Sequence, residues 1–384
     1  MSPKSLFFCK SGRLIIVLVI LLADFLTGRS MASENGNSLT FIDVNAGIVY
    51  AQVGTDHFAA IDAKTGSVLW NFEDKRLRLF TKAVFRSDAL FVAAMGTNLS
   101  SELIRLDLAT GRTDWRVPIA DLGGNASPVL CGGEVLVPDY RHRVVSAFNI
   151  ASGKNDWKTE SLPFLFLFPP AVLENNALFL VADKKEPESK QQLLYLSCGD
   201  GQPGKTLPVR IDGVSRTPVL LYKDSVVLSG YDRVLGTSLQ AIRLGDGTKL
   251  WAALIPDEIA RFTPTIQENL LVSGAGSVWV LDLETGKIAF REALPTPSVP
   301  VAVANGMVFF SRASHTVEAR ELPSGKLRWK TRIEGLISSN IVALDRNIYV
   351  KTAGNRLAVL SMTGQIDSYL QIGKPDASAA SASH

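Results

Sequence analysis

Cysteine and histidine are scarce in this sequence, and their scarcity excludes two classes of small site. Among 384 residues there are only three cysteines, Cys9, Cys131 and Cys198, and four scattered histidines, His57, His142, His315 and His384. Three cysteines cannot form a disulfide framework, and the histidines lack the spacing of zinc ligands. We expect Cys131 and Cys198 to be buried thiols, with a disulfide between them as the less favoured alternative.

Strong net charge is also absent. The chain has 40 Lys and Arg against 37 Asp and Glu, a net charge of +3, which is too small to predict a nucleic-acid partner. Hydrophobic residues make up 46% and charged residues 20%, so the composition predicts a folded protein with an extensive core. The length allows two ordinary domains or one large all-β ring.

The apolar run near the N-terminus is too short for a membrane span. Lys4, Lys10 and Arg13 precede Leu14–Leu26, and small residues at Ser30 and Ala32 follow it, a pattern typical of a signal peptide. As a helix the run would be about 20 Å long, against a hydrocarbon core of about 30 Å.

We therefore predict a signal peptide over residues 1–32, cleaved after Ala32, with an uncleaved anchor as the alternative. A short N-terminal linker over 33–38 follows, and the mature protein is expected in the periplasm or otherwise exported. No cysteine lies between the apolar run and Cys131, so we predict no lipid anchor.

A short motif recurs along the rest of the chain. Its first copy has Ala60, then Gly66 six positions later and Trp70 ten positions later. Three further full copies, three weaker ones and a degenerate one around Gly201 follow, and the last pairs Gly364 with Ser368. Gly66 and Gly364 are 298 residues apart, so the seven intervals average about 43 residues, the length of a propeller blade.

Short apolar runs between turn signals fill each repeat, and they indicate strands rather than helices. We therefore predict an all-β fold over residues 39–373, an eight-bladed β-propeller with four antiparallel strands per blade, followed by a disordered tail over 374–384. The first or last strand could cross over to close the ring.

The repeated glycine and aromatic residues have predicted structural roles. The glycine supplies the positive φ of a tight turn, and Asp62, Asp107 or Asp282 caps that turn. The aromatic residue packs at the seam between blades. The predicted docking residues are Gly66, Trp70, Gly111, Trp115, Gly153, Trp157, Gly247, Trp251, Gly286, Phe290, Gly325 and Trp329.

These residues resemble the tryptophan-docking motif of the quinoprotein (PQQ-type) propeller repeat family over about residues 39 to 373. In size and plainness the chain is similar to the propeller subunits of the outer-membrane β-barrel assembly machinery. That resemblance implies a non-catalytic scaffold that docks a protein partner through its loops. The chain departs from those subunits in lacking the acylated cysteine, and the nearest counterpart of their docking loop is the segment 210–215.

Catalytic machinery is not predicted. Quinoprotein dehydrogenases of similar fold are longer and carry a pair of adjacent cysteines over the cofactor, and this sequence has no such pair. Asp62, Asp107 and Asp282 recur once per repeat, so symmetry spreads them around the ring as turn caps. We assign no catalytic, cofactor-binding or metal-binding residue.

Segments that differ between repeats are candidates for partner binding, because repeat proteins place function in their loops. The run from Phe164 through Phe166 to Phe168 is apolar on both faces, so it is either sandwiched in the ring or exposed to a partner. Two basic segments are either solvated loops or sites for an anion or an acidic partner, and they contain Arg76, Arg78, Arg141 and Arg143.

The sequence thus predicts a non-enzymatic, exported scaffold that mediates protein–protein interaction in the cell envelope, as a monomer within a complex. One candidate partner is a component of outer-membrane protein assembly. The alternatives are a PQQ-dependent or carbohydrate-active enzyme, and a sensor with a ligand in the central channel.

Overall fold

Antiparallel β-strands make up the regular structure of the residues that can be described. A computed structural model describes residues 42–371 except 46, 54–56, 82, 99, 121–126, 186–190, 212, 214, 216, 257–258, 265–268, 275–276, 294–300, 312–314, 345 and 354–355. The described residues belong to one compact unit, residues 37–384. The predicted signal peptide (1–32), linker (33–38) and tail (374–384) lie outside them.

The first four sheets follow one another along the chain. Sheet 1 contains β1 (Ile42–Asn45), β2 (Ile48–Val53), β3 (His57–Asp62) and β4 (Val68–Glu73). Sheet 2 contains β5 (Leu77–Phe80), β6 (Val84–Phe85), β7 (Ala89–Gly96), β8 (Ser101–Asp107) and β9 (Thr113–Ile119). Sheet 3 contains β10 (Val129–Cys131), β11 (Glu134–Asp139), β12 (Val144–Asn149) and β13 (Asn155–Lys158). Sheet 4 contains β14 (Phe164–Phe166), β15 (Ala171–Leu173), β16 (Asn176–Asp183), β17 (Gln191–Ser197) and β18 (Pro203–Val209).

The remaining four sheets have four strands each. Sheet 5 contains β19 (Leu220–Tyr222), β20 (Ser225–Asp232), β21 (Gly236–Arg243) and β22 (Lys249–Ile255). Sheet 6 contains β23 (Ile259–Pro264), β24 (Asn269–Gly274), β25 (Ser277–Asp282) and β26 (Ile288–Ala293). Sheet 7 contains β27 (Val301–Ala304), β28 (Met307–Ser311), β29 (Thr316–Glu321) and β30 (Leu327–Arg332). Sheet 8 contains β31 (Ile337–Leu344), β32 (Asn347–Thr352), β33 (Arg356–Ser361) and β34 (Ile366–Gln371).

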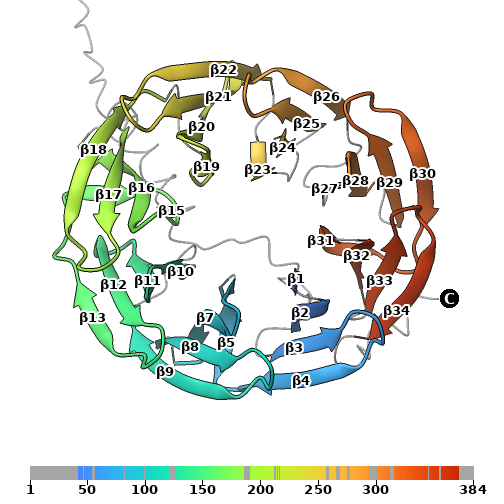
Figure 1. Ribbon diagram of the computed structural model, residues 1–384, viewed down its shortest axis with the longest axis horizontal. Helices are drawn as coiled ribbons and strands as arrows, with labels where there is room; N and C mark the ends of the chain where they lie inside the picture. The colour runs from blue at the N-terminus through green and yellow to red at the C-terminus, as the bar shows by residue number, and fades with distance from the viewer. Residues whose placement is uncertain are drawn as a thin grey trace, which may run out of the picture. The chain divides into compact units, whose positions relative to one another are not determined.

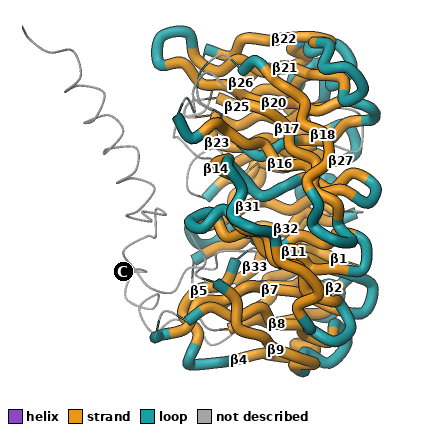
Figure 2. Tube along the Cα trace, turned by 90° about the vertical axis from the view of Figure 1, so that its left-hand side faces the viewer, coloured by secondary structure: helices purple, strands orange, loops and turns teal. Residues whose placement is uncertain are grey.

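The sheets stand side by side around a ring, with the first strand of each sheet innermost and the last strand outermost (Figure 1). From the side, the connecting loops gather at the two ends of the strands (Figure 2). This arrangement places the loops on two opposite faces, where they are accessible. Within the described part of the chain, no helix has the length and hydropathy needed to cross a membrane.

The prediction of four strands in every blade is wrong. Sheets 2 and 4 have five strands, because their innermost strand is broken into two segments that both pair with the next strand. In sheet 4 the break between β14 and β15 contains Pro169 and Pro170. Proline has no backbone N–H, so it cannot donate to the ladder at this point.

The hydrophobic core lies between the sheets. Alternating side chains of each strand point to opposite faces, so each sheet contributes to the seam before it and to the seam after it. Clusters of buried apolar residues join sheets 1 and 2, 2 and 3, 3 and 4, 4 and 5, 5 and 6, 6 and 7, and 7 and 8. A further cluster, which includes Ile61 and Leu370, joins sheet 8 to sheet 1 and closes the ring.

Among the described residues, neither sheet 1 nor sheet 8 borrows a strand from the other end of the chain. Each is formed by consecutive strands, and side-chain packing joins the first sheet to the last. The strand crossover considered from the sequence does not occur between these strands.

Candidate functional site

The repeated aromatic residues lie against the glycine of the following sheet. A Cβ added to Gly153 would come within 2.7 Å of Trp115 Cδ2, and one added to Gly286 within 2.5 Å of Trp251 Cε3. Only a glycine leaves room for the ring at this distance, and its φ is also positive, +69° at Gly153. The same contact occurs in the pairs Trp70–Gly111, Trp157–Gly201, Trp329–Gly364 and Phe290–Gly325.

Each of the five motif tryptophans also donates a hydrogen bond across its seam. The acceptor is a backbone carbonyl two or three residues before the glycine that the ring contacts. The indole Nε1 to O distances are 3.0 Å for Trp70 to Leu108, 3.1 Å for Trp115 to Ile150, 2.9 Å for Trp157 to Cys198, 2.9 Å for Trp251 to Leu283 and 2.8 Å for Trp329 to Met362.

Aspartate side chains cap the turns that carry these glycines. Asp62 Oδ1 accepts from the Thr65 backbone N–H at 2.6 Å, and Asp282 Oδ1 accepts from the Thr285 N–H at 2.7 Å. Hydrogen bonds from the threonine hold the pKa of each of these carboxyls below its ordinary value. The prediction that the recurring aspartates are turn caps is confirmed, and the caps fix the position of the glycine.

Two seams have an aliphatic side chain where the others have an aromatic ring. Leu207 Cδ1 lies 3.1 Å from an added Cβ on Gly247, and Leu370 Cδ2 lies 2.7 Å from one on Gly66. Each leucine lies six residues after its own repeat glycine, two positions beyond the tryptophan slot and on the same strand face. The sequence pairing of Gly364 with Ser368 therefore names the wrong side chain, because Leu370 makes the contact.

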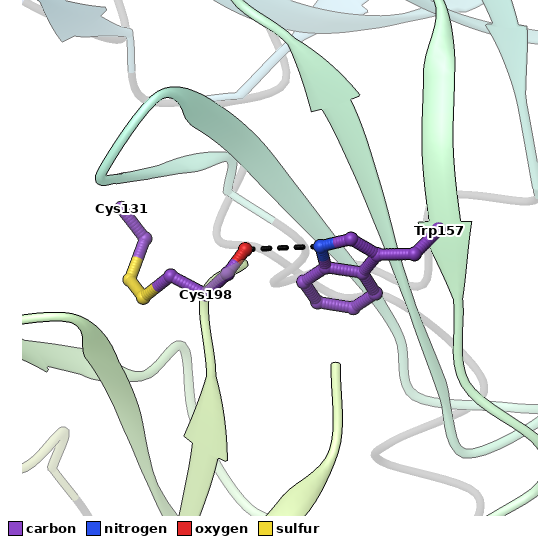
Figure 3. The surroundings of a disulfide bond; sticks show 3 residues. All are labelled: Cys131, Trp157 and Cys198. Atoms are coloured by element: carbon purple, nitrogen blue, oxygen red, sulfur yellow. Dashed lines mark hydrogen bonds between the residues drawn. A yellow bond between two sulfur atoms is a disulfide. The ribbon is translucent and has the colours of Figure 1, made fainter. Parts of the chain in front are cut away.

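Cys131 and Cys198 form a disulfide across the seam between sheets 3 and 4, so the prediction of buried thiols is wrong (Figure 3). Their Cα atoms are 5.6 Å apart, within the range that a disulfide requires. The turn after β10 lies beside the turn after β17, which brings the two residues together despite a separation of 67 positions. The carbonyl of Cys198 also accepts the hydrogen bond of Trp157.

The apolar run at residues 164–168 lies between two seams. Phe166 is buried against Phe179, with ring centroids 4.8 Å apart, and Phe164 packs on the same cluster. Leu167 packs on the opposite cluster, between sheets 4 and 5, while Phe168 is half-buried. Apolar residues on both faces are thus needed here for packing within the ring.

The arginines of the basic segments are near the surface, in two different loops. Arg76 is exposed and pairs with Asp74 at 2.7 Å, and Asp74 also binds Arg116 at 2.9 Å. These arginines hold the pKa of Asp74 far below its ordinary range. Arg143 donates to Ser161 Oγ at 3.2 Å, and Arg141 is exposed. The side chain of Arg78 lies outside the described part of the structure.

The described histidines lie on three different sheets, each with its own hydrogen-bond partner. His57 contacts Asn71 at 3.2 Å, His142 contacts Asp139 at 2.7 Å, and His315 contacts the carbonyl of Gly335 at 2.9 Å. Among the residues that the structure describes, no group of three or more His, Cys, Asp or Glu could hold a metal ion.

An apolar hairpin tip on sheet 5 was missed from the sequence. Val234 and Leu235 connect β20 to β21 and are 89% and 62% exposed. Asp232 Oδ1 fixes the tip by accepting from the N–H groups of Val234 and Leu235 at 2.8 and 2.9 Å. Two consecutive apolar residues in a turn, where polar ones are usual, were the available signal. We call Val234 and Leu235 the sheet 5 tip.

The family described as "Outer membrane protein assembly factor BamB" matches residues 29–204 and 235–383. The match covers most of the chain and both halves of the ring. The chain belongs to this family. It is a PQQ-like repeat propeller similar to BamB. No curated protein sequence matches it.

Solved structures of family members and other propellers share the fold. BamB from Moraxella catarrhalis is 15% identical with a TM-score of 0.60, covering 83% of this chain and 95% of its own. Quinohemoprotein alcohol dehydrogenase from Comamonas testosteroni is 12% identical with a TM-score of 0.62, covering 89% and 76%. Apo AztD from Citrobacter koseri is 13% identical with a TM-score of 0.57, covering 84% and 94%. At these identities the likeness concerns the fold alone.

Proposed function

We propose that this protein is a non-enzymatic scaffold that binds another protein in the cell envelope, in a role like that of an outer-membrane protein assembly factor. The observation that carries the proposal is the sheet 5 tip, where two large apolar side chains are held in water by a structured turn. Exposed apolar residues presented on a rigid element are typical of protein-binding surfaces. Membership in the BamB family supports the same role.

Export is part of this proposal. A disulfide persists in oxidising compartments, so the bond between Cys131 and Cys198 supports a location outside the cytoplasm. The apolar run and small residues before residue 33 support cleavage of a signal peptide. Because both cysteines are buried, cells are quenched in acid and the protein is alkylated in denaturant, with and without prior reduction, to test the location. Labelling of both cysteines without a reductant would contradict it.

The docking role is tested by a photocrosslinking residue placed at position 235 in the cells that produce the protein. We expect a crosslink to a component of outer-membrane protein assembly. The Val234→Ser, Leu235→Ser double variant should weaken binding of that component by at least about tenfold, since each side chain loses the free energy of apolar burial. Leu327→Ser is the matched control, because Leu327 is 46% exposed on the outer strand of sheet 7. Equal losses in both variants would contradict docking at the tip.

The alternative of a PQQ-dependent enzyme has its own test. The protein shares its fold with quinohemoprotein alcohol dehydrogenases, and a titration with PQQ and Ca²⁺ followed by absorbance distinguishes the two roles. We expect no saturable spectral change. A stoichiometric change would overturn the scaffold proposal.

A further inference from the structure

We propose that the seam between sheets 4 and 5 holds a binding site for a free aromatic α-amino acid, whose ring occupies the cavity beside the slot that holds a tryptophan at other seams. The site is distinct from the sheet 5 tip, so it does not depend on the scaffold role. The proposal rests on the residue in the tryptophan slot, the cavity beside it, and the polar groups that line this cavity, among them the Tyr195 hydroxyl without a hydrogen-bond partner.

Lys205 occupies the tryptophan slot of sheet 4. It lies four residues after Gly201, the spacing that separates Gly66 from Trp70. Its Nζ donates to the Leu244 carbonyl at 3.4 Å, three residues before Gly247, which is the acceptor position that indole groups use at most other seams. The ammonium also lies 4.7 Å from the centroid of the Tyr195 ring, within cation–π range. Lys205 therefore replaces the hydrogen bond of the indole but supplies no ring.

A cavity of about 390 Å³ lies beside this slot. Leu173 and Leu244 provide apolar walls, and the backbone of Gly204 and Gly245 lines the cavity without side chains. An added Cβ on Gly245 would meet no atom within 4 Å, so this wall is open. The volume is near the lower end of the range for small-ligand sites, about 300 to 1,000 Å³.

The repeat glycine of this seam is already in contact with Leu207, which lies 3.1 Å from an added Cβ on Gly247. The ligand ring is therefore expected beside Lys205 and Leu244, which line the cavity, and not over Gly247.

Polar groups at the cavity define the rest of the ligand. Lys205 has no ion-pair partner within 4.0 Å among the described residues, and the buried Tyr195 hydroxyl has no hydrogen-bond partner there. Burial raises the pKa of Tyr195, so the hydroxyl remains a donor at neutral pH. Both groups suit a carboxylate. Glu174 and the Asn176 amide also line the cavity and can accept from an ammonium group. A carboxylate, an ammonium and an aromatic ring together describe an aromatic amino acid.

The test uses the full mature protein and isothermal titration calorimetry with L-tryptophan. We expect saturable binding. Indole-3-propionate lacks the amine, and tryptamine lacks the carboxylate, so each should bind about tenfold more weakly or less well still. Absence of saturable heat at millimolar L-tryptophan would overturn the proposal, and so would equal binding of the three compounds.

Three variants assign the binding to this seam. Lys205→Trp restores the motif and should abolish binding while raising the melting temperature, because the new indole fills the cavity. Lys205→Met should weaken binding by about tenfold through loss of the charge. Lys158→Met, an exposed lysine on β13 of the neighbouring sheet, is the control and should bind as the wild type does. Undiminished binding by folded Lys205→Trp would contradict this location.

Discussion

The two seams of sheet 4 are built differently. On the side of sheet 3, the seam has the indole of Trp157 over Gly201, a hydrogen bond to the Cys198 carbonyl and the disulfide between Cys131 and Cys198. On the side of sheet 5, the seam has Lys205 in the tryptophan slot, Leu207 beside Gly247 and an adjacent cavity. Sheet 4 thus has a disulfide-linked seam on one side and, on the other, a seam without the disulfide and without a tryptophan in the slot.

This difference shows that one tryptophan performs two separable tasks. At the first seam the indole both covers the glycine and donates the hydrogen bond. At the second seam Lys205 makes the hydrogen bond and Leu207 approaches the glycine, so two smaller groups share the work. The divided arrangement keeps the ring closed, and a cavity of about 390 Å³ lies beside it.

Removal of the disulfide should have the largest effect on this comparison. The bond closes a loop of 67 residues, for which the chain-entropy relation gives about 4 kcal/mol of stabilisation. We expect the double variant Cys131→Ser, Cys198→Ser to lose about this much free energy of unfolding, measured by denaturant titration. The matched single variants should each give nearly the full loss. A loss below about 1 kcal/mol would show that the seam is held by packing alone.

The second largest effect should come from truncating Trp157 and Lys205, the residues in the tryptophan slots of the two seams. We expect Trp157→Ala to cost about 3 kcal/mol, because Trp157 is half-buried and a tryptophan truncation costs about 3 to 5 kcal/mol when the ring is in a core. Lys205→Ala should cost below about 1 kcal/mol, since Lys205 is an exposed residue and its one printed hydrogen bond is long, at 3.4 Å. Denaturant unfolding of both variants measures the difference, and equal costs would contradict the division of tasks.

Alanine at the repeat glycines gives a finer comparison. Gly286 and Gly247 have φ values of +68° and +76°, so the backbone strain of an added side chain is similar at both. At Gly286 the new Cβ would also collide with Trp251, whereas at Gly247 it would meet Leu207 at 3.1 Å. We expect Gly286→Ala to be less stable than Gly247→Ala by about 1 to 3 kcal/mol, the usual cost of overpacking. The reverse order would show that the indole does not occupy the glycine surface.

The smallest effect should be a pH dependence of stability that comes from Glu134, whose strand neighbour Cys131 forms the disulfide. Glu134 pairs with Cys131 in the ladder of sheet 3, and burial followed by the charge of Asp156 raises its pKa to about 7. Between the ordinary value of 4.5 and about 7 the folded protein holds this proton more tightly than the unfolded chain does. The contribution of Glu134 to stability therefore falls as pH rises through this window.

The variant Glu134→Gln removes that dependence. We expect its melting temperature to exceed that of the wild type at pH 8 and to match it near pH 4, as measured by calorimetry. An equal difference at both pH values would mean that Glu134 acts through packing and not through its charge.

The sequence was sufficient for the regular parts of the fold. Recurrence of glycine and tryptophan four residues apart predicts a ring of antiparallel sheets, because each glycine requires a tight turn and each tryptophan requires a surface to pack on. The aspartate caps follow from the same regularity. The broken inner strand of sheet 4 was also readable from Pro169 and Pro170, although the prediction of uniform blades ignored them.

Contacts between repeats were harder to predict. Cys131 and Cys198 occupy different turns of their repeats, so the alignment of repeats alone does not bring them together. Leu207 and Leu370 lie two positions beyond the expected slot, on the same face of the strand. There they contact the repeat glycine in place of the missing aromatic ring. These features depend on how neighbouring sheets meet, which the pattern within one repeat does not specify.

The candidate sites were predicted least well. Phe164 and Phe166 pack within the ring, while the exposed Val234 and Leu235 were overlooked because a pair of apolar residues in a turn gives no periodic signal. The cavity beside Lys205 becomes visible only when the degenerate copy is compared with its neighbours in space. The fold followed from what the repeats share, whereas the sites depend on where single repeats depart from the rest.

The way in which sheets 1 and 8 meet has a consequence for the order of the chain. Because each of these sheets is complete in itself, the covalent break in the ring falls between two finished units and not within one. The starting point of the polypeptide is therefore not dictated by the architecture. A gene rearranged to begin at another linker would encode the same eight sheets in the same circular order, and the protein could evolve new termini without rebuilding any of them.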